Sequence, residues 1–438
     1  MTPFGWSQIA RLGLVQASLG AVIVLITSVL NRVMIVELGL AAAIPGALVA
    51  GHYVVQLSRV HAGFGSDRSG RRTPWIVAGM AVVAVSGFVA AVATAQMADS
   101  VVVGVLLASV ACVTLGAGVS VAGTPLLALL AERTTSARRG PSAAIVWLMM
   151  IAGFAITAAT VGRLLDPFSL DRMIAVSAGV SLVAFGVTAL ALWRLEGTAT
   201  PVARPADDAS VPFRAAVAAI WAEGEARRFA SFVFVAMLAY SAQDLILEPF
   251  AGTVFGLTPG ETTRISSLQH GGMFVGMIGT AIATRRGARL TQWAAAGCVG
   301  SAAGFVALLV AGWSGSEPLL RLSILGMGAA NGVFAIGAIG AMMALVDQPG
   351  RREAGVRMGL YGSAQAIAFA AGGFLGAGLS DVARALLGSP RLGYATVFLL
   401  EALLFVLAAW FAMRATPADQ RASIRLERDG DAILAAAR

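Results

Sequence analysis

The sequence predicts an all-α integral membrane protein with twelve transmembrane helices, arranged as two six-helix pseudo-repeats, and with both termini in the cytoplasm. Three observations predict it. The 438 residues have a mean hydropathy of +0.82. Apolar runs of the roughly 20 residues that a helix needs to cross a bilayer recur along the chain. The basic residues gather in the short stretches between those runs. A soluble domain shows none of these features.

The apolar runs define the expected elements in order. The first run is followed by many others and no small-residue cleavage site stands out, so we interpret it as a transmembrane helix and not as a removable signal peptide. The runs between polar breaks predict twelve spans, at 11–36, 43–58, 75–96, 101–131, 142–165, 173–193, 229–251, 262–284, 291–313, 319–346, 357–382 and 393–414.

The arginines predict the orientation. The chain has no lysine, so all 31 basic residues are arginine, and the formal net charge is +8. Eighteen arginines lie in the even-numbered loops, and six more are Arg11, Arg414 at the end of the last span and four residues of the tail. Cytoplasmic loops carry an excess of arginine and lysine, which places these loops and both termini in the cytoplasm. Charge spread over short loops argues for the lipid bilayer as the partner and against nucleic acid.

A polar segment divides the chain into two halves. Residues 196–228 form the longest polar interruption and predict a cytoplasmic linker between a half at 1–195 and a half at 229–414, with a cytoplasmic tail at 415–438. An internal repeat supports the division, because Glu132 and Asp347 each end an apolar span before paired arginines and a glycine, 215 residues apart. Such a duplication is typical of transporter folds.

The loop between the second and third spans carries a charged motif in an apolar chain. Its residues are Gly63, Asp67, Arg68, Gly70, Arg71 and Arg72. This spacing resembles the loop signature of the major facilitator superfamily, and the resemblance implies that fold. It also implies that Asp67 docks near Arg357 and latches the two halves together. The alternative is a solvated loop that only fixes topology.

Several polar residues are expected at membrane depth, where a charge costs at least a few kcal/mol. Such residues should face the interior and find partners, and we expect Arg32 to pair with Asp244 or Glu248 at the junction of the halves. One interpretation is a site for a ligand head group or a protonatable switch, and the other is a structural ion pair. The candidate polar site comprises Gln16, Asn31, Arg32, Glu37, Gln243, Asp244, Glu248, Asn331 and Gln365.

Two of the three histidines are candidate ligands for a pigment. His52 and His270 lie in the second and eighth predicted spans, and a neutral imidazole can be an axial ligand to the metal of a tetrapyrrole. The alternative for each is a hydrogen bond to a neighbouring residue. No clustered ligands for a free metal ion, no covalent cofactor site and no catalytic motif stand out, so we do not expect an enzyme.

A narrower resemblance rests on four stretches, which begin at Arg11, Leu30, Gly51 and Ala242 and include "LNRVMIVELGL" and "AQDLILEPFAG". They resemble the PucC and LhaA group, the bacteriochlorophyll delivery family of phototrophic bacteria. The resemblance implies a multi-pass protein of the inner, intracytoplasmic membrane that assists light-harvesting assembly. Bacteriochlorophyll or its precursors would be carried as a ligand, and bacteriochlorophyll synthase and the antenna polypeptides would be partners.

Two other functions stay open from the residues themselves. A proton-coupled transporter of a small polar solute would use Asp244 or Glu248 as its titrating group. A scaffold would bind membrane partners and carry no ligand.

Overall fold

The computed structural model describes residues 3–59, 62, 66, 71–196, 224–284, 290–346 and 354–414, and these ranges contain helices and no strand. The first half consists of α1 (Trp6–Val24), η1 (Leu25–Leu30), η2 (Val33–Glu37), α2 (Ala43–Val55), η3 (Gln56–Ser58), α4 (Thr73–Gln96), α5 (Val101–Arg133), α6 (Ser136–Leu164) and α7 (Leu170–Leu192). The second half consists of α9 (Gly224–Phe255), α10 (Pro259–Thr284), α11 (Leu290–Ser314), α12 (Glu317–Val346), α13 (Ala354–Leu387) and α14 (Pro390–Arg414).

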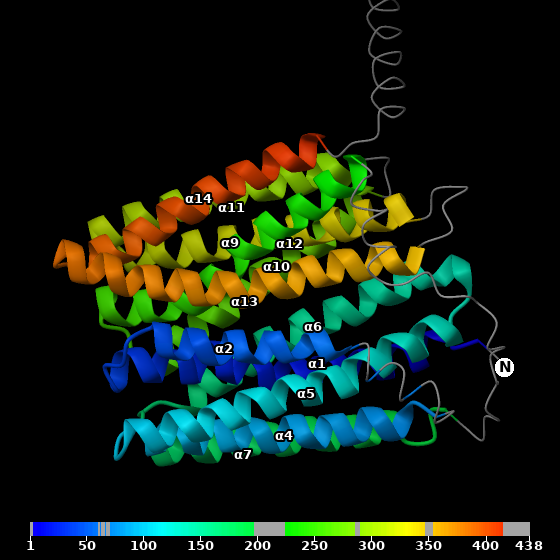
Figure 1. Ribbon diagram of the computed structural model, residues 1–438, viewed down its shortest axis with the longest axis horizontal. Coiled ribbons are helices and arrows are strands. Elements are labelled where there is room, and N and C mark those ends of the chain that lie inside the picture. Colours follow the sequence, from blue (N-terminus) through cyan, green and yellow to red (C-terminus); the bar gives the residue numbers. More distant parts are fainter. Residues whose placement is uncertain are drawn as a thin grey trace, which may run out of the picture.

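The helices form two bundles that lie side by side, α1 to α7 in one and α9 to α14 in the other (Figure 1). Each bundle has its own hydrophobic core. One core is built almost entirely from residues before 196, and the other from residues between 229 and 412. Two helix pairs join the bundles along their length, α2 with α13 and α6 with α10. We call these the α2–α13 seam and the α6–α10 seam.

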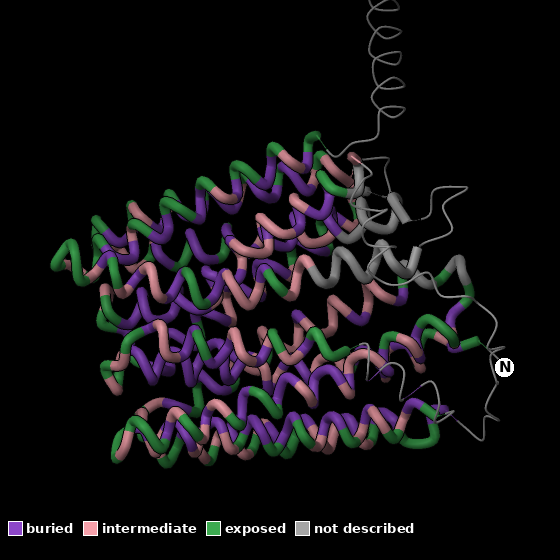
Figure 2. The backbone as a smooth tube through the Cα atoms, viewed as in Figure 1, coloured by how far each residue is buried: buried purple, intermediate pink, exposed green. Residues whose placement is uncertain are grey.

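Ten helices of the described part are long and apolar enough to cross a membrane. The helices α2 and α10 are not among them, although they run beside the others and form the seams. In α10 the reason is a polar first half, which contains Thr262, Thr263, Ser266 and Ser267. Those side chains face protein and not lipid, since all four are buried or half-buried. Figure 2 shows the same pattern in the bundles, with buried residues on the inner helix faces.

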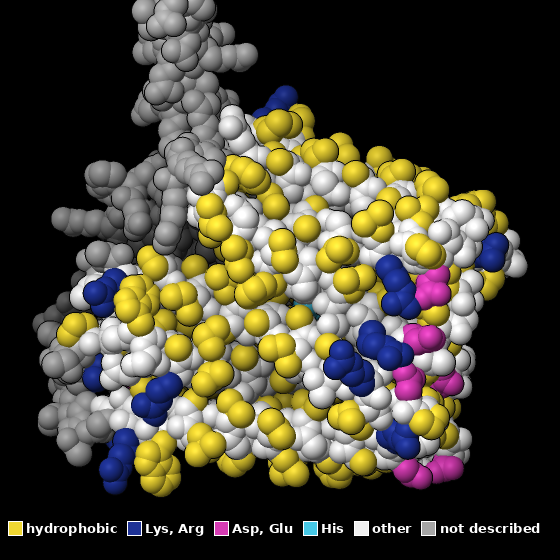
Figure 3. All heavy atoms as spheres, turned by 180° about the vertical axis from the view of Figure 1, so that it is seen from behind, with side chains coloured by type: hydrophobic (Ala, Val, Ile, Leu, Met, Phe, Trp, Pro, Cys, Tyr) yellow, Lys and Arg dark blue, Asp and Glu magenta, His cyan; other side chains and the backbone are white. Residues whose placement is uncertain are grey.

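The outer surface fits a bilayer. Side chains such as Val102, Leu182 and Leu386 are 70–79% exposed, which in water would be costly. Figure 3 shows one face of the molecule, where a broad band of hydrophobic side chains lies between charged side chains at the two ends. An exposed apolar band of this kind is what a lipid-facing surface requires.

The first helix changes from α-helical to π-helical geometry in the part that contains several of its polar residues. α1 continues through the π-helical segments η1 and η2 to Glu37, so the first span covers Trp6–Glu37. π-helical turns often occur at functional sites. We refer below to the Trp6 end of the bundles, where α1 begins, and to the Glu37 end, where η2 stops.

The charged loop motif is described only in part. Gly63, Asp67, Arg68 and Gly70 lie outside the described residues, so the latch between Asp67 and Arg357 stays a prediction. Arg72 is buried, and its guanidinium donates to both carboxylate oxygens of Glu132 at 2.7 and 3.0 Å. The backbone N–H groups of Arg72 and Thr73 donate to Glu196. These bonds join the start of α4 to the end of α5 and to Glu196, which follows α7.

Candidate functional site

Glu248 of α9 is the centre of a polar cluster between the bundles. One of its carboxylate oxygens accepts hydrogen bonds from the hydroxyls of Ser28, in η1, and Ser266, in α10. The other oxygen is buried and has no hydrogen-bond partner among the described residues. Because Ser28 belongs to the first bundle, Glu248 joins the two halves inside the membrane.

Arg32 does not pair as the sequence predicted. Its guanidinium forms an ion pair with Glu37, five residues further along the same segment, and donates to the carbonyl oxygen of Leu257 at 2.7 Å. The expected direct ion pair with Asp244 or Glu248 is therefore wrong, although Arg32 interacts electrostatically with Glu248. The π-helical turns of η2 bring Glu37 back toward Arg32, and sequence periodicity for an α-helix does not reveal this. Arg32 still links the halves, but through a backbone carbonyl.

The other two candidates of the first half, Asn31 and Gln16, also contact neighbouring helices. The Asn31 amide donates to the carbonyl oxygen of Leu245 in α9 at 2.7 Å, which adds a second tie between the bundles. The Gln16 amide contacts the sulfur of Met150 in α6 at 3.2 Å. Asp244 of α9 is half-buried and has no hydrogen bond or ion pair in the described part of the chain. It interacts electrostatically with Glu248, one turn away, and with the tyrosines at 53 and 240.

Three of the predicted residues lie away from this cluster. Gln243 and Asn331 hydrogen-bond each other at 3.2 Å, and Asn331 also accepts from the hydroxyl of Ser301 at 2.7 Å. All three are buried in the core of the second bundle. Gln365 contacts the sulfur of Met237 at 3.8 Å. The polar residues that were predicted to form one site therefore belong to two groups. One is the cluster around Glu248 at the junction, and the other is the Gln243–Asn331 network inside the second half.

His52 is held within the first bundle. The amide of Gln56, whose oxygen accepts from Arg59, donates to Nε2 of His52, with the nitrogens 2.7 Å apart. The lone pair that a metal would need is therefore occupied. The backbone on this side has little room, because a Cβ atom on Gly116 of α5 would lie 2.4 Å from the His52 carbonyl oxygen.

His270 has the opposite arrangement. Its Nδ1 lies 2.8 Å from the carbonyl oxygen of Ser266 one turn earlier, and since a carbonyl only accepts, Nδ1 carries the proton. Nε2 therefore presents its lone pair, and it has no hydrogen-bond partner within the described ranges. The ring packs edge-on against Phe154 of α6, with centroids 5.0 Å apart. His270 thus lies in the α6–α10 seam with one nitrogen fixed and the other available.

The seam around His270 is apolar and lined by flexible side chains. A separate cluster contains Ile151, Met273 and Met277, with half-buried aromatic and methionine side chains packed against it at positions 147, 150, 154 and 274. None of these residues is charged. Methionine side chains adapt easily to different neighbours. Such a surface suits a large apolar ligand that bears one group for an imidazole to bind.

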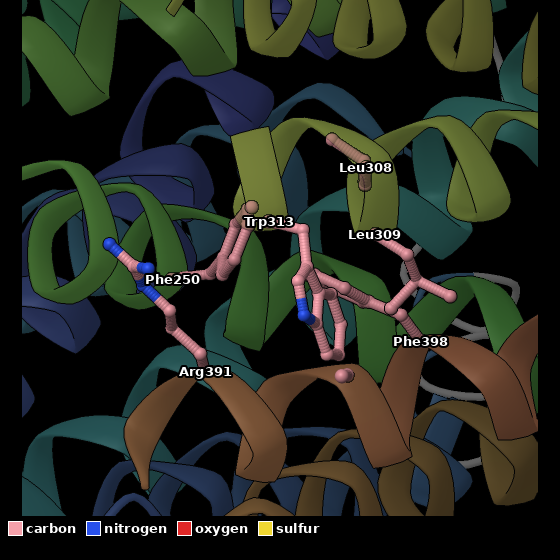
Figure 4. Close-up of a pocket in the computed structure, with 8 residues that line it drawn as sticks. Phe250, Leu308, Leu309, Trp313, Arg391 and Phe398 are labelled. Carbon is pink, nitrogen blue, oxygen red and sulfur yellow. The ribbon is translucent and has the colours of Figure 1, made fainter. Parts of the chain in front are cut away.

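A shallow pocket of about 10 Å³ lies away from both seams, between α9, α11 and α14 (Figure 4). Its volume is below the roughly 300–1,000 Å³ of typical ligand sites. A tetrapyrrole would not fit within it. Its labelled lining residues are Phe250, Leu308, Leu309, Trp313, Arg391 and Phe398.

Sequence reasoning missed three polar residues at membrane depth. Ser28 and Ser266 gave no signal, because serine occurs throughout apolar helices and only the fold shows that both face Glu248. Glu401 in α14 is visible in the sequence as a lone acid in an apolar run, but it was not among the predicted site residues. It is 1% exposed, and neither carboxylate oxygen has a hydrogen-bond partner among the described residues.

Comparison with known proteins gives a consistent family match. The family model described as "PUCC protein" matches residues 29–419. A Rhodobacter capsulatus protein named "Bacteriochlorophyll synthase 44.5 kDa chain" is 45% identical over 93% of this chain and 95% of its own length. A protein of the same organism named "Protein PucC" is 28% identical over 93% of this chain and 92% of its own length.

Solved structures share the fold at low sequence identity. A bacterial homologue of the human lysosomal transporter Spinster, in an inward-facing conformation, has a TM-score of 0.66 and 13% identity, over 93% of this chain and 96% of the other. A bacterial homologue of the drug–peptide transporters PepT1 and PepT2 has a TM-score of 0.70 and 16% identity, over 95% and 99%. At these identities the likeness concerns the fold alone.

Proposed function

Because this chain belongs to the PucC family, we propose that it assists bacteriochlorophyll delivery and light-harvesting complex assembly in a phototrophic bacterium. The family match over most of the chain supports this function, and so does a relative at 45% identity whose name refers to bacteriochlorophyll synthase. The pigment is the carried ligand, and no covalent cofactor is involved. Bacteriochlorophyll synthase, as donor, and the antenna polypeptides, as acceptors, are the proposed partners.

The proposed topology has twelve spans in two halves, at 1–195 and 229–414, with the linker 196–228 and the tail 415–438 in the cytoplasm. It counts α2 and α10 as spans, which their position between neighbouring membrane helices supports. The arginine-rich loops favour cytoplasmic termini. The proposed location is the inner, intracytoplasmic membrane.

The observation that best supports pigment binding is the hydrogen bonding of His270, which leaves one ring nitrogen free. A histidine that ligates a metal through one ring nitrogen typically donates its other N–H to a carbonyl or carboxylate. His270 has this arrangement toward the Ser266 carbonyl, and its free Nε2 lies in an apolar seam. When the pigment is bound, its magnesium supplies the metal for that nitrogen. His52 is the weaker candidate, because Gln56 occupies its Nε2.

An absorption spectrum tests this proposal. The full chain is purified in mild detergent from a pigment-producing host, as wild type and as the variants His270→Ala and His52→Ala. We expect bound bacteriochlorophyll in the wild type and in His52→Ala, and loss of most of it in His270→Ala. Pigment retained in His270→Ala but lost in His52→Ala would reverse the ligand assignment. A wild-type preparation without pigment would contradict delivery and favour the scaffold or the solute transporter.

The solute transporter is the second candidate, and a specific observation favours keeping it. Glu248 lies at the junction of the halves with one free oxygen, and Asp244 is half-buried one turn away. This alternative expects solute uptake that depends on a pH gradient and is lost in Glu248→Gln, with no effect of His270→Ala. The delivery proposal expects the reverse.

We also propose that the chain is not itself an enzyme, despite the word synthase in a relative's name. The purified protein should leave a bacteriochlorophyllide and a prenyl diphosphate unjoined when the two are incubated with it. Ester formation by the protein alone, measured by chromatography of the pigments, would contradict this.

A further inference from the structure

A notch in the α6–α10 seam lies directly beside His270. Gly271 of α10 is half-buried, and a Cβ atom placed on it would meet no atom within 4 Å. Gly279, further along the same helix, also has open space but is exposed, and two glycines closer to Gly271 have none. A Cβ atom on Gly272 or Gly276 would lie 2.0–2.3 Å from carbonyl oxygens of α12. The helix is therefore packed tightly on its α12 side and is open at Gly271.

The notch faces the bilayer at the edge of the seam. Gly271 shares a helix stripe with Val275 and Ile278, which are 65% and 37% exposed. On its other side, one turn earlier, Ser267 reaches α6 and donates to the carbonyl oxygen of Ala155 at 2.8 Å. The next residue inward is His270, which is 5% exposed. A ligand at the notch would thus have lipid on one side and the imidazole on the other.

The helix opposite the notch, α6, has a largely exposed surface. Among the ten candidate spans of the described part, the one in α6 has the smallest share of buried residues, 22%, although α6 packs on both α1 and α10. Toward the Trp6 end, the seam is filled by the methionine and aromatic side chains of the Ile151 cluster. Side chains of this kind can move aside at lower cost than close backbone contacts.

From these observations we infer that the notch at Gly271 is the lateral port through which a bacteriochlorin passes between the bilayer and His270. The inference rests on the proposed function and adds the route by which the pigment reaches His270. The chemistry around the port indicates which kind of ligand it admits. The neighbouring seam residues are apolar and uncharged, which suits a planar macrocycle with a long hydrocarbon tail, and the adjacent residue, His270, has one ring nitrogen without a hydrogen bond.

The test fills the notch in the full-length protein. Gly271→Leu is compared with Gly279→Leu, a control at an exposed glycine of the same helix that also has no atom within 4 Å of its Cβ position. Each is purified in mild detergent from a pigment-producing host, and pigment per protein is read from the absorption spectrum. We expect loss of most of the pigment in Gly271→Leu and a wild-type level in Gly279→Leu.

A second measurement removes any dependence on folding. Pigment-free Gly271→Cys and Gly279→Cys proteins are labelled with a bulky maleimide after purification, and bacteriochlorophyll in detergent is then added. The native cysteines, Cys112 and Cys298, are buried. Labelling at position 271 should block pigment uptake, and labelling at 279 should not.

The outcomes separate the two proposals. Wild-type protein that binds no pigment contradicts the proposed function. Wild-type protein that binds pigment, together with undiminished uptake when position 271 is filled or labelled, overturns the port while leaving the function intact.

Discussion

Glycine has opposite roles at two places along the junction of the halves. At the Glu37 end of the α2–α13 seam, a Cβ atom on Gly46 would lie 3.0 Å from the Cβ of Ala377 and 3.3 Å from the Cα of Phe374. In the middle of the α6–α10 seam, a Cβ atom on Gly271 would meet nothing. The first glycine lets two helices touch, and the second leaves a space.

The difference indicates which part of the junction is fixed and which part can adapt. The Gly46 contact is strengthened by Asp381, whose carboxylate accepts from the backbone N–H of Ala43 at 2.8 Å and pairs with Arg384. Further along the α2–α13 seam, the rings of Tyr53 and Phe369 meet at 5.0 Å. The seam at Gly271 instead has methionines and a notch. With rigid contacts at one place, the proposed ligand path at the other requires no separation of the halves.

The largest expected effect comes from giving both glycines the same side chain. Gly46→Leu forces the close helices apart and should cost about 3 kcal/mol, at the upper end of the range for overpacking. Gly271→Leu enters open space and should leave stability unchanged. The apparent melting temperature of each variant in detergent measures this, with Gly279→Leu as control. Equal losses in Gly46→Leu and Gly271→Leu would remove the distinction between the two places.

A smaller effect is expected from the acid that anchors the tight seam. Asp381→Ala removes the acceptor for the Ala43 N–H and the partner of Arg384, so it should cost about 1.5 kcal/mol, as for a hydrogen bond to a charged group. Asp381→Asn keeps an oxygen acceptor and should lose less. Melting curves of the two variants give the order, and the pigment content of both should equal that of the wild type. Pigment loss in Asp381→Ala would show that this seam also serves the ligand.

The smallest effect is expected at the Glu37 end of the α6–α10 seam. Asp166 pairs with Arg264 at 2.6 Å, but both side chains are a third or more exposed, so the pair should contribute less than about 1 kcal/mol. Asp166→Asn should shift the melting temperature slightly, and less so at high salt, where the wild-type pair is also screened. A shift as large as that of Gly46→Leu would mean that this end, too, is a fixed contact.

The interior polar residues show how far sequence reasoning reached. Arg32 was correctly expected to find partners at the junction, because a charge in an apolar span requires them. The acid expected to form its direct ion pair was wrong, since the π-helical turn that brings Glu37 back is not visible in an α-helical pattern. Gln243 and Asn331 were expected at the same site but lie in a separate buried network, because helix rotation decides which bundle face a residue joins.

By itself, the sequence determined that the chain is helical and enters the membrane, and its resemblances indicated the family. Those properties follow from composition, from run length and from local motifs, which every conformation of the chain shares. Only the tertiary structure decided that the ring lone pair of His270 is free while that of His52 accepts from Gln56, and that Gly271 borders open space while Gly46 does not. Both depend on what a neighbouring helix places opposite the residue, and helix rotation and register are set by packing across the whole bundle.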